Sequence, residues 1–288
     1  MLRFVPMRID SHQHFWHYQA PSYPWITERM RILQRDYLPA ELEPLLRAGG
    51  FDGCIAVQAC QSVEDTAFLL ELARRHAFVK GVVGWVDLCS DRLDEQLARF
   101  ALDPKLVGVR HIVHDEPDDD FMLRADFRRG IGRLRELDLT YDLLLFPRHI
   151  PRAVRLVEEF PDQPFVLDHI AKPLIRDGQF SPWREDLRRL ARVPHVTCKL
   201  SGLVTEARWN SWRPEDIHPY LDIVVEAFGP SRLMIGSDWP VCLLAGDYGR
   251  VMDVVVNYVG RLSEDERRGV LGENAARVYI GSAPPASR

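Results

Sequence analysis

The amino-acid sequence predicts an α/β fold, a single-domain (β/α)8 TIM barrel, from three observations. Strand-like and helix-like segments alternate about eight times, and continuous alternation of this kind implies parallel strands in a number that closes a barrel. The 288 residues suit one such domain. No linker or low-complexity segment interrupts the chain. An open doubly wound sheet is the alternative, but no Gly-x-Gly-x-x-Gly follows a predicted strand.

The predicted strands are short runs rich in β-branched residues, bounded by turn or capping signals. In order, they are residues 8–14, 54–59, 80–87, 106–113, 139–145, 165–169, 195–200 and 233–237. The predicted helices between and after them are residues 38–48, 62–76, 92–101, 120–136, 150–160, 183–191, 214–228 and 247–260. The helix 62–76 has the clearest pattern, because Ser62 can cap its first turn and Leu69 and Leu72 share one face.

The two ends of the chain complete this prediction of one domain over residues 1–288. Two further helical stretches, 263–271 and 273–279, are expected to cap the barrel. Residues 1–7 are expected to form an N-terminal arm, and residues 281–288 a loose tail.

Composition and charge exclude several classes of partner. The net charge is −5, and 37 basic residues are interspersed with 42 acidic ones, so there is no basic stripe for nucleic acid. No apolar run approaches the roughly 20 residues of a membrane span, and the start of the chain lacks a signal-peptide core. Five cysteines without a Cys-x-x-Cys pair suggest reduced thiols. These features predict a cytoplasmic protein, and they leave its oligomeric state open.

Two histidines, His12 and His14, lie at the carboxyl end of the first predicted strand. Residues two apart on a strand point to the same face, roughly 6 to 7 Å from one another along the backbone. Their rings can therefore converge on one metal ion or one substrate oxygen. Catalytic residues of α/β barrels come from this end of the strands, which favours a functional interpretation of the pair.

The sixth and eighth predicted strands also end in polar residues. An apolar run ends at Asp168 and His169, and another leads through Ser237 to Asp238. An aspartate in such a position is either a helix N-cap or a site residue. Beside the histidines of the first strand, Asp238 is better explained as a site residue.

Further candidates for substrate binding follow other strands. Arg110 ends the fourth strand and Lys199 lies in the seventh, while Gln58 lies near the end of the second. A guanidinium can hold a carbonyl oxygen or a carboxylate with several fixed donors. A structural ion pair of Arg110 with Asp142 or Asp87 is the alternative, and the pattern does not show whether Lys199 or its neighbour Cys198 points inward.

Tryptophans cluster in the same connections, and amphipathic rings around a pocket suit a substrate with one apolar face and many hydroxyls, such as a sugar derivative. Packing beneath long loops is the alternative explanation. We assign Trp25, Trp85 and Trp239 to substrate binding. The full set near strand ends is Trp16, Trp25, Trp85, Trp209, Trp212 and Trp239.

At these positions the chain resembles the amidohydrolase superfamily. Its opening His-x-His, strand-six histidine and strand-eight aspartate are matched by the set His12, His14, His169 and Asp238. The segments IDSHQHFW, GVRH, KLSGL and GSDWP are similar to the sugar-lactonase branch, which includes L-fuconolactonases, L-rhamnonolactonases and pyrone-dicarboxylate lactonases. The similarity covers nearly the whole chain.

This resemblance implies hydrolysis of an aldonolactone, with L-fucono-lactone as the best candidate. Asp238 would act as general base and then general acid, and Arg110 would polarise the carbonyl. The three histidines would orient water and stabilise the oxyanion. They could do so through one zinc ion that they hold together with Asp238, or as metal-independent donors. Arg110 and the run 141–143 replace ligands that binuclear members carry, which argues against two metals.

Other functions fit the same sequence. A metal-dependent decarboxylase or an amide hydrolase would use a similar scaffold, and a barrel that binds a sugar acid without catalysis would belong to a different class. A covalent acyl-serine route is disfavoured because no Gly-x-Ser-x-Gly motif is present.

Overall fold

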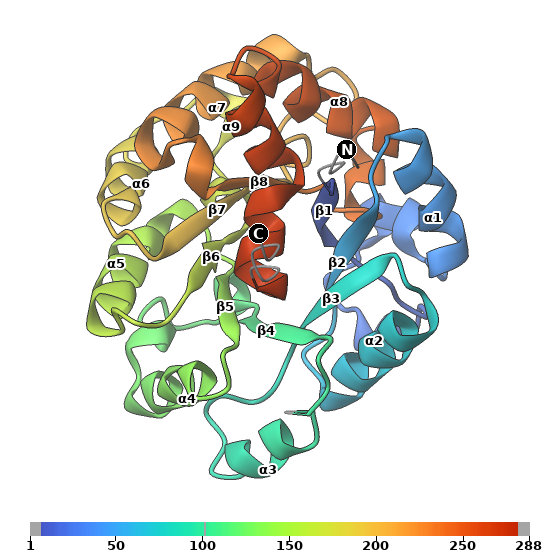
Figure 1. The fold of residues 1–288 in the computed structure, drawn as a ribbon. Helices are drawn as coiled ribbons and strands as arrows, with labels where there is room; N and C mark the ends of the chain where they lie inside the picture. Colours follow the sequence, from blue (N-terminus) through green and yellow to red (C-terminus); the bar gives the residue numbers. More distant parts are fainter. Residues whose placement is uncertain (1–6, 101, 282–288) are drawn as a thin grey trace, which may run out of the picture.

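A computed structural model, which describes residues 7–100 and 102–281, confirms the (β/α)8 barrel. Eight strands pair in parallel in the order β1 to β8, and helices surround them (Figure 1). The strands are β1 (Ile9–Gln13), β2 (Gly53–Val57), β3 (Val79–Gly84), β4 (Leu106–His111), β5 (Thr140–Leu143), β6 (Phe165–Leu167), β7 (Val196–Leu200) and β8 (Leu233–Ile235). The helices are α1 (Pro39–Ala48), α2 (Val63–Arg75), α3 (Leu93–Ala98), α4 (Ala125–Arg135), α5 (Ile150–Glu159), α6 (Trp183–Ala191), α7 (Pro214–Phe228), α8 (Tyr248–Val259) and α9 (Glu264–Arg268).

The barrel closes between β1 and the residues that follow β8. The Asp238 amide donates to the carbonyl of His12 at 2.8 Å, and the His14 amide donates to the carbonyl of Trp239 at 2.7 Å. This seam brings the first and last predicted site segments together, although more than 220 residues separate them in the sequence.

Most predicted strands extend beyond the observed ones at their carboxyl ends. Residues 168–171 leave the sheet because His169, Ile170 and Ala171 have positive φ angles of 52°, 49° and 59°. The predicted helix 120–136 is divided in a similar way. Arg124 has an extended ψ of 143°, which separates a short 3-10 turn from α4.

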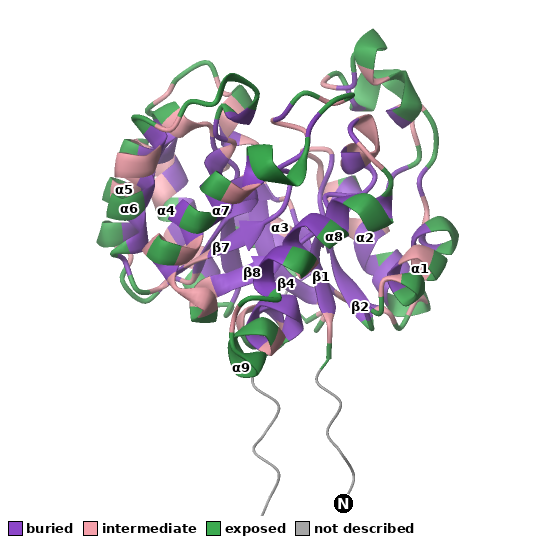
Figure 2. Cartoon of the chain, turned by 90° about the horizontal axis from the view of Figure 1, so that it is seen from above, coloured by how far each residue is buried: buried purple, intermediate pink, exposed green. Residues whose placement is uncertain are grey.

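The barrel interior is apolar towards the amino ends of the strands and charged towards their carboxyl ends. The apolar layer contains Ile9, Ile55, Val57, Val83, Val107, Val166, Met234, Ala275 and Tyr279. Figure 2 shows buried strands surrounded by helices whose outer faces are exposed. Outside the barrel, the apolar faces of the helices pack against the strands in a second, larger core.

The C-terminal segment after α8 caps one end of the barrel, as predicted (Figure 1). The helix α9 is followed by wider helical turns over Gly269–Glu273 and Ala276–Ile280 in place of the two predicted helices. Ala275 and Tyr279 extend from these turns into the apolar layer.

The expected arm and tail lie outside the described residues apart from Met7 and Gly281, so their arrangement stays a prediction. Within residues 7–100 and 102–281, none of the helices combines the length and apolar character that crossing a bilayer requires.

Candidate active site

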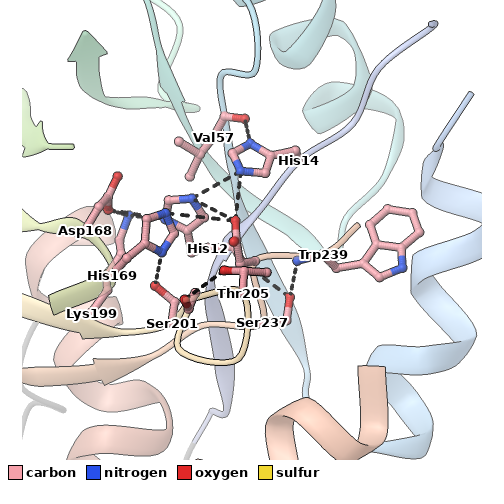
Figure 3. A network of polar contacts seen from close by, with 12 residues as sticks. His12, His14, Val57, Asp168, His169, Lys199, Ser201, Thr205, Ser237 and Trp239 are labelled. Atoms are coloured by element: carbon pink, nitrogen blue, oxygen red, sulfur yellow. Dashed lines mark hydrogen bonds and ion pairs between the residues drawn. The ribbon is translucent and has the colours of Figure 1, made fainter. Parts of the chain in front are cut away.

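Four residues predicted from the sequence meet at the carboxyl end of the barrel, and Figure 3 labels the three histidines among them, His12, His14 and His169. The Oδ1 atom of Asp238 lies 3.3 Å from His14 Nε2, 3.8 Å from His12 Nε2 and 4.0 Å from His169 Nε2. All four side chains are buried. The structure therefore places one carboxylate oxygen against three imidazole nitrogens.

Asp10 fixes the backbone on both sides of this cluster. Its Oδ1 atom accepts from the amides of Ser237 at 2.8 Å and His12 at 3.2 Å. Burial raises the pKa of Asp10 to about 6, although these hydrogen bonds oppose that shift. Asp10 lies two residues before His12, but an aspartate within a buried strand gives no sequence signal of this role.

His169 owes its position to a left-handed turn and to a glycine. Ser201 Oγ lies 2.9 Å from His169 Nδ1 and fixes the ring from the side of β7. Gly202 has a φ of 62°, and a Cβ atom there would lie 2.5 Å from His169 Nδ1. Only glycine lets the β7 loop approach the imidazole this closely.

The hydrogen bonds of His12 and His14 determine where their rings carry protons. His14 Nδ1 lies 2.8 Å from the carbonyl oxygen of Val57, which can only accept, so Nδ1 carries the proton and Nε2 a lone pair. His12 Nδ1 lies 3.3 Å from the Asp168 carboxylate, and Arg110 donates to His12 Nε2 at 3.3 Å. The Nε2 lone pair of His12 therefore faces Arg110, and that of His14 faces Asp238.

A layer of ion pairs lies directly beneath the histidines. Lys199 Nζ contacts Asp142 at 2.6 Å and Asp168 at 3.0 Å, and Arg110 contacts the other oxygen of Asp168 at 3.0 Å. Lys199 and Arg110 together balance the charges of Asp142 and Asp168. Each of these charges has a partner, as buried charges require.

Tyr279 connects this ion-pair layer to the C-terminal cap. Its hydroxyl donates to Asp142 Oδ2 at 2.7 Å, and Lys199 Nζ lies 5.2 Å from the centre of its ring. The cap therefore supports the underside of the site as well as closing the barrel.

Burial and neighbouring charges set the protonation states. Burial alone would raise the pKa of Asp238, but His169, His14 and Lys172 outweigh it and lower that pKa below 3.8. Burial lowers the pKa values of His12 and His169 well below 6.5. At neutral pH the cluster therefore contains an ionised Asp238 beside neutral His12 and His169.

A cavity of about 330 Å³ opens above the cluster. Two of the predicted tryptophan set, Trp25 and Trp209, contribute to its walls. The lining residues are His14, Trp25, Met30, Ala59, Arg110, Ile112, His114, Asp115, Leu144, Phe146, His169, Lys172, Thr205, Glu206, Trp209, Asp238, Val241 and Leu244. This mixture of apolar walls and a few converging polar groups is typical of a small-molecule site.

Four residues predicted to bind substrate do not line this cavity. Lys199 is fully buried in the ion-pair layer, and Trp239 packs edge-on against Tyr37. The third, Trp85, donates to His111 Nδ1. The fourth is Gln58, which is fully buried. The sequence pattern placed these residues at strand ends correctly but could not show which side chains reach the cavity.

Arg110 lines the cavity, but its terminal N–H groups have protein partners. One nitrogen contacts Asp168 and His12, and the other contacts the backbone and side-chain oxygens of Gln58. Asp168, rather than Asp142 or Asp87, is the ion-pair partner of this guanidinium. Arg110 therefore holds the histidine layer in place.

Sequence analysis missed five polar residues that line the cavity: His114, Asp115, Lys172, Thr205 and Glu206. His114 stacks on Phe146 at the cavity wall. Its pKa falls to about 2, mainly because of burial, so it is neutral. Lys172 and Glu206 lie in irregular loops, where neither periodicity nor a motif marks them.

The donor set fits a divalent cation. The two Nε2 lone pairs of His12 and His14 lie only 3.3 Å apart, beside the Asp238 carboxylate, and this arrangement is repulsive without a proton or a cation between them. Ligand atoms of the three residues all lie within 4.8 Å of one another. Imidazole nitrogen and carboxylate oxygen are common zinc ligands.

Comparison with known proteins identifies the family of this chain. The sequence profile of the amidohydrolase family matches residues 9–280. The chain is 46% identical to an L-fucono-1,5-lactonase of Burkholderia multivorans, over 98% of this chain and 99% of the relative. It is 40% identical to an L-fucono-1,5-lactonase of Burkholderia ambifaria, over 96% of each chain.

A solved structure shares the whole fold. The crystal structure of an amidohydrolase from Burkholderia multivorans with bound zinc superposes with a TM-score of 0.92 and is 47% identical, covering 95% of this chain and 99% of the other. The family profile, these relatives and the superposed barrel agree, and the chain belongs to the amidohydrolase family.

Proposed function

We propose that this protein hydrolyses a sugar lactone to the aldonic acid, with L-fucono-1,5-lactone as the substrate. The observation that carries the proposal is the position of Asp238 Oδ1 within 4.0 Å of three histidine nitrogens at the base of a cavity of about 330 Å³. The similarity to two L-fucono-1,5-lactonases supports the choice of substrate.

In the proposed mechanism Asp238 is the general base. All three histidine contacts are made by its Oδ1 atom, so Oδ2 is the oxygen proposed to accept a proton from the attacking water. Water adds to the ring carbonyl and forms a tetrahedral oxyanion. When that intermediate collapses, the ester C–O bond breaks, and protonated Asp238 returns the proton to the ring oxygen.

The three histidines orient the water, which can donate to the Nε2 lone pair of His14 while it faces Asp238. The histidine rings need to be held rigidly, because preorganised groups need no rearrangement at the moment of reaction. His12 is held by Asp168 and Arg110, His14 by the Val57 carbonyl, and His169 by Ser201.

A single divalent cation, with zinc as the candidate, fits the donors of His12, His14, His169 and Asp238. When bound, it would polarise the lactone carbonyl as a Lewis acid. The guanidinium of Arg110, 3.3 Å from His12 Nε2, disfavours a second cation beside it. Asp168 and Ser201 would then act by orienting the ligand rings.

Proton release from a panel of aldonolactones, measured with a pH indicator on purified protein, tests this function. We expect turnover above the spontaneous rate, highest with L-fucono-1,5-lactone. The same preparation is assayed after chelation and after zinc is restored, with its metal content determined each time.

The same assay separates the competing functions. Release of carbon dioxide from aromatic acids, or of amine from amides, in place of lactone turnover would establish a decarboxylase or an amide hydrolase. Tight binding of a lactone without turnover would establish a sugar-acid-binding barrel.

A further inference from the structure

We propose that Lys172 and Glu206 together bind two neighbouring hydroxyl groups of the substrate, which makes the pair a determinant of specificity for polyhydroxylated lactones. This inference rests on the proposed lactonase function and concerns the wall of the cavity rather than its catalytic base. Lys172 Nζ lies 3.1 Å from Glu206 Oε1, and both residues line the cavity.

The left-handed turn after β6 places Lys172 in the site. His169, Ile170, Ala171 and Lys172 have consecutive positive φ angles between 48° and 59°, and the Lys172 amide donates to the His169 carbonyl at 2.8 Å. In a turn with three residues per repeat, positions i and i+3 lie on the same side. His169 and Lys172 therefore enter the same cavity, and both line it.

Such a turn is costly for residues other than glycine. Left-handed conformations are unfavourable for residues with a Cβ atom, and strain of this kind persists where the surrounding structure enforces it, often at functional sites. The sequence has no glycine among these four residues. The benefit that the turn provides is the joint placement of His169 and Lys172.

Lys172 retains N–H donors for a ligand, whereas the terminal nitrogens of the other two cations near the site are occupied. Lys199 is fully buried and contacts Asp142, Asp168 and His12, and the terminal nitrogens of Arg110 are engaged as described above. Within the described residues, Lys172 has one side-chain partner, Glu206, and an ammonium has three N–H donors. Two of its donors are therefore available.

The Lys172–Glu206 pair can be reached from the cavity. The side chains of Lys172 and Glu206 retain 17% and 21% of their exposure. Glu206 and Trp209 share the loop after β7, where Trp209 donates to the Thr205 carbonyl at 2.9 Å. A hydroxyl-bearing edge at the ion pair and an apolar face against the Trp209 wall suit a sugar ring.

The Lys172–Glu206 ion pair is better suited to binding hydroxyl groups than to stabilising an oxyanion. Glu206 neutralises the charge of Lys172, so the pair supplies little net positive charge to an oxyanion. It offers one donor and one acceptor about as far apart as the oxygens of a vicinal diol, so one hydroxyl can accept from Lys172 while the other donates to Glu206. An unsubstituted lactone leaves both groups without these partners.

Two variants, Lys172→Met and Glu206→Gln, test the proposal on two substrates with the same carbon skeleton. L-Fucono-1,5-lactone carries ring hydroxyls, whereas δ-hexalactone has the same ring and methyl group without them. We expect each variant to lower kcat/KM for the hydroxylated lactone about 10- to 100-fold, mainly through KM, with less than about a threefold change for δ-hexalactone. Lys80→Met, on β3 at the amino end of the barrel, is the control.

Equal losses on both lactones, or a loss in kcat at unchanged KM for the hydroxylated lactone, would overturn the proposal in favour of a catalytic role. Unchanged kinetics on the hydroxylated lactone would overturn it as well. In either case the wild-type enzyme still hydrolyses the lactone, so the proposed function survives. If wild-type protein hydrolyses neither lactone, the proposed function itself fails, and the inference fails with it.

Discussion

Asp238 is the residue around which the site is built, and it has a positive φ of 58° that turns its carboxylate back over the barrel. Its pKa is lowered despite burial, while burial lowers those of His12 and His169. These protonation states provide a base and unprotonated imidazoles at the same pH. Asp168 and Ser201 have no reactive role in this account and act through the histidines that they hold.

The pH dependence of activity follows from these states. Asp238 is ionised, and His12 and His169 are neutral, at every pH above 6.5. We therefore expect kcat/KM to be level from pH 6.5 to about 8 and to fall only as acid protonates these groups. Initial rates from about pH 4 to 8, corrected for spontaneous hydrolysis, measure this profile. If kcat/KM instead falls to half its plateau value at a pH above 6.5, the assignment of an ionised Asp238 and neutral His12 and His169 is contradicted.

Residues that hold the histidines should affect metal affinity. Ser201→Ala removes the partner of His169 Nδ1, and Asp168→Asn weakens the support of His12. We expect either change to weaken zinc binding about 10- to 100-fold, measured by competition with a chromogenic chelator. Asp177→Asn, an exposed carboxyl change outside the network, should bind zinc like wild type. Wild-type affinity in both network variants would contradict the proposed ligand set.

Among the elements, the strands were predicted well and the turns after them were not. Periodicity located all eight strands, because buried apolar alternation is encoded over several neighbouring residues. No comparable sequence pattern predicts the left-handed turn at residues 169–172, since these residues include no glycine. For the same reason Lys172 was missed, although it lies three residues after His169, which was predicted as a site residue.

A matched pair of substitutions measures the strain in that turn. Ala171 and Ala153 are both fully buried, but Ala171 has a φ of 59° whereas Ala153 lies in α5. Glycine relieves a left-handed residue but destabilises a helix by about 0.5 to 1 kcal/mol. In urea denaturation, the free energy of unfolding of the Ala171→Gly variant should therefore exceed that of Ala153→Gly by about 1 to 2 kcal/mol. Equal losses in the two variants would mean that the turn is not strained.

At the scale of the whole molecule, the site depends on contacts between distant parts of the chain. His12 and Asp238 could be predicted because His12 lies near the carboxyl end of β1 and Asp238 follows β8, and equivalent strand ends meet in a barrel. The ion-pair layer could not be predicted, because Asp142, Asp168 and Lys199 meet only after the barrel closes. Nor did any motif indicate that Tyr279, in the C-terminal cap, would reach Asp142.

The C-terminal cap should therefore contribute to global stability. Tyr279 is 4% exposed and joins the apolar layer inside the barrel. We expect Tyr279→Ala to lower the free energy of unfolding by about 3 to 5 kcal/mol, in line with other large aromatic truncations in cores. Val278 is a partly buried neighbour, and Val278→Ala should lower the free energy of unfolding by less. If the two variants unfold at the same urea concentration, the cap is not part of the cooperative core.

The central claim is that Asp238 drives lactone hydrolysis, and kcat of Asp238→Asn on L-fucono-1,5-lactone tests it most directly. The wild-type and variant proteins are compared at equal concentration after circular dichroism and thermal melting confirm the same fold. We predict a loss of about 10² to 10⁴ in kcat, the usual contribution of a positioned general base. Wild-type turnover by the folded variant would contradict this assignment and remove Asp238 from the mechanism.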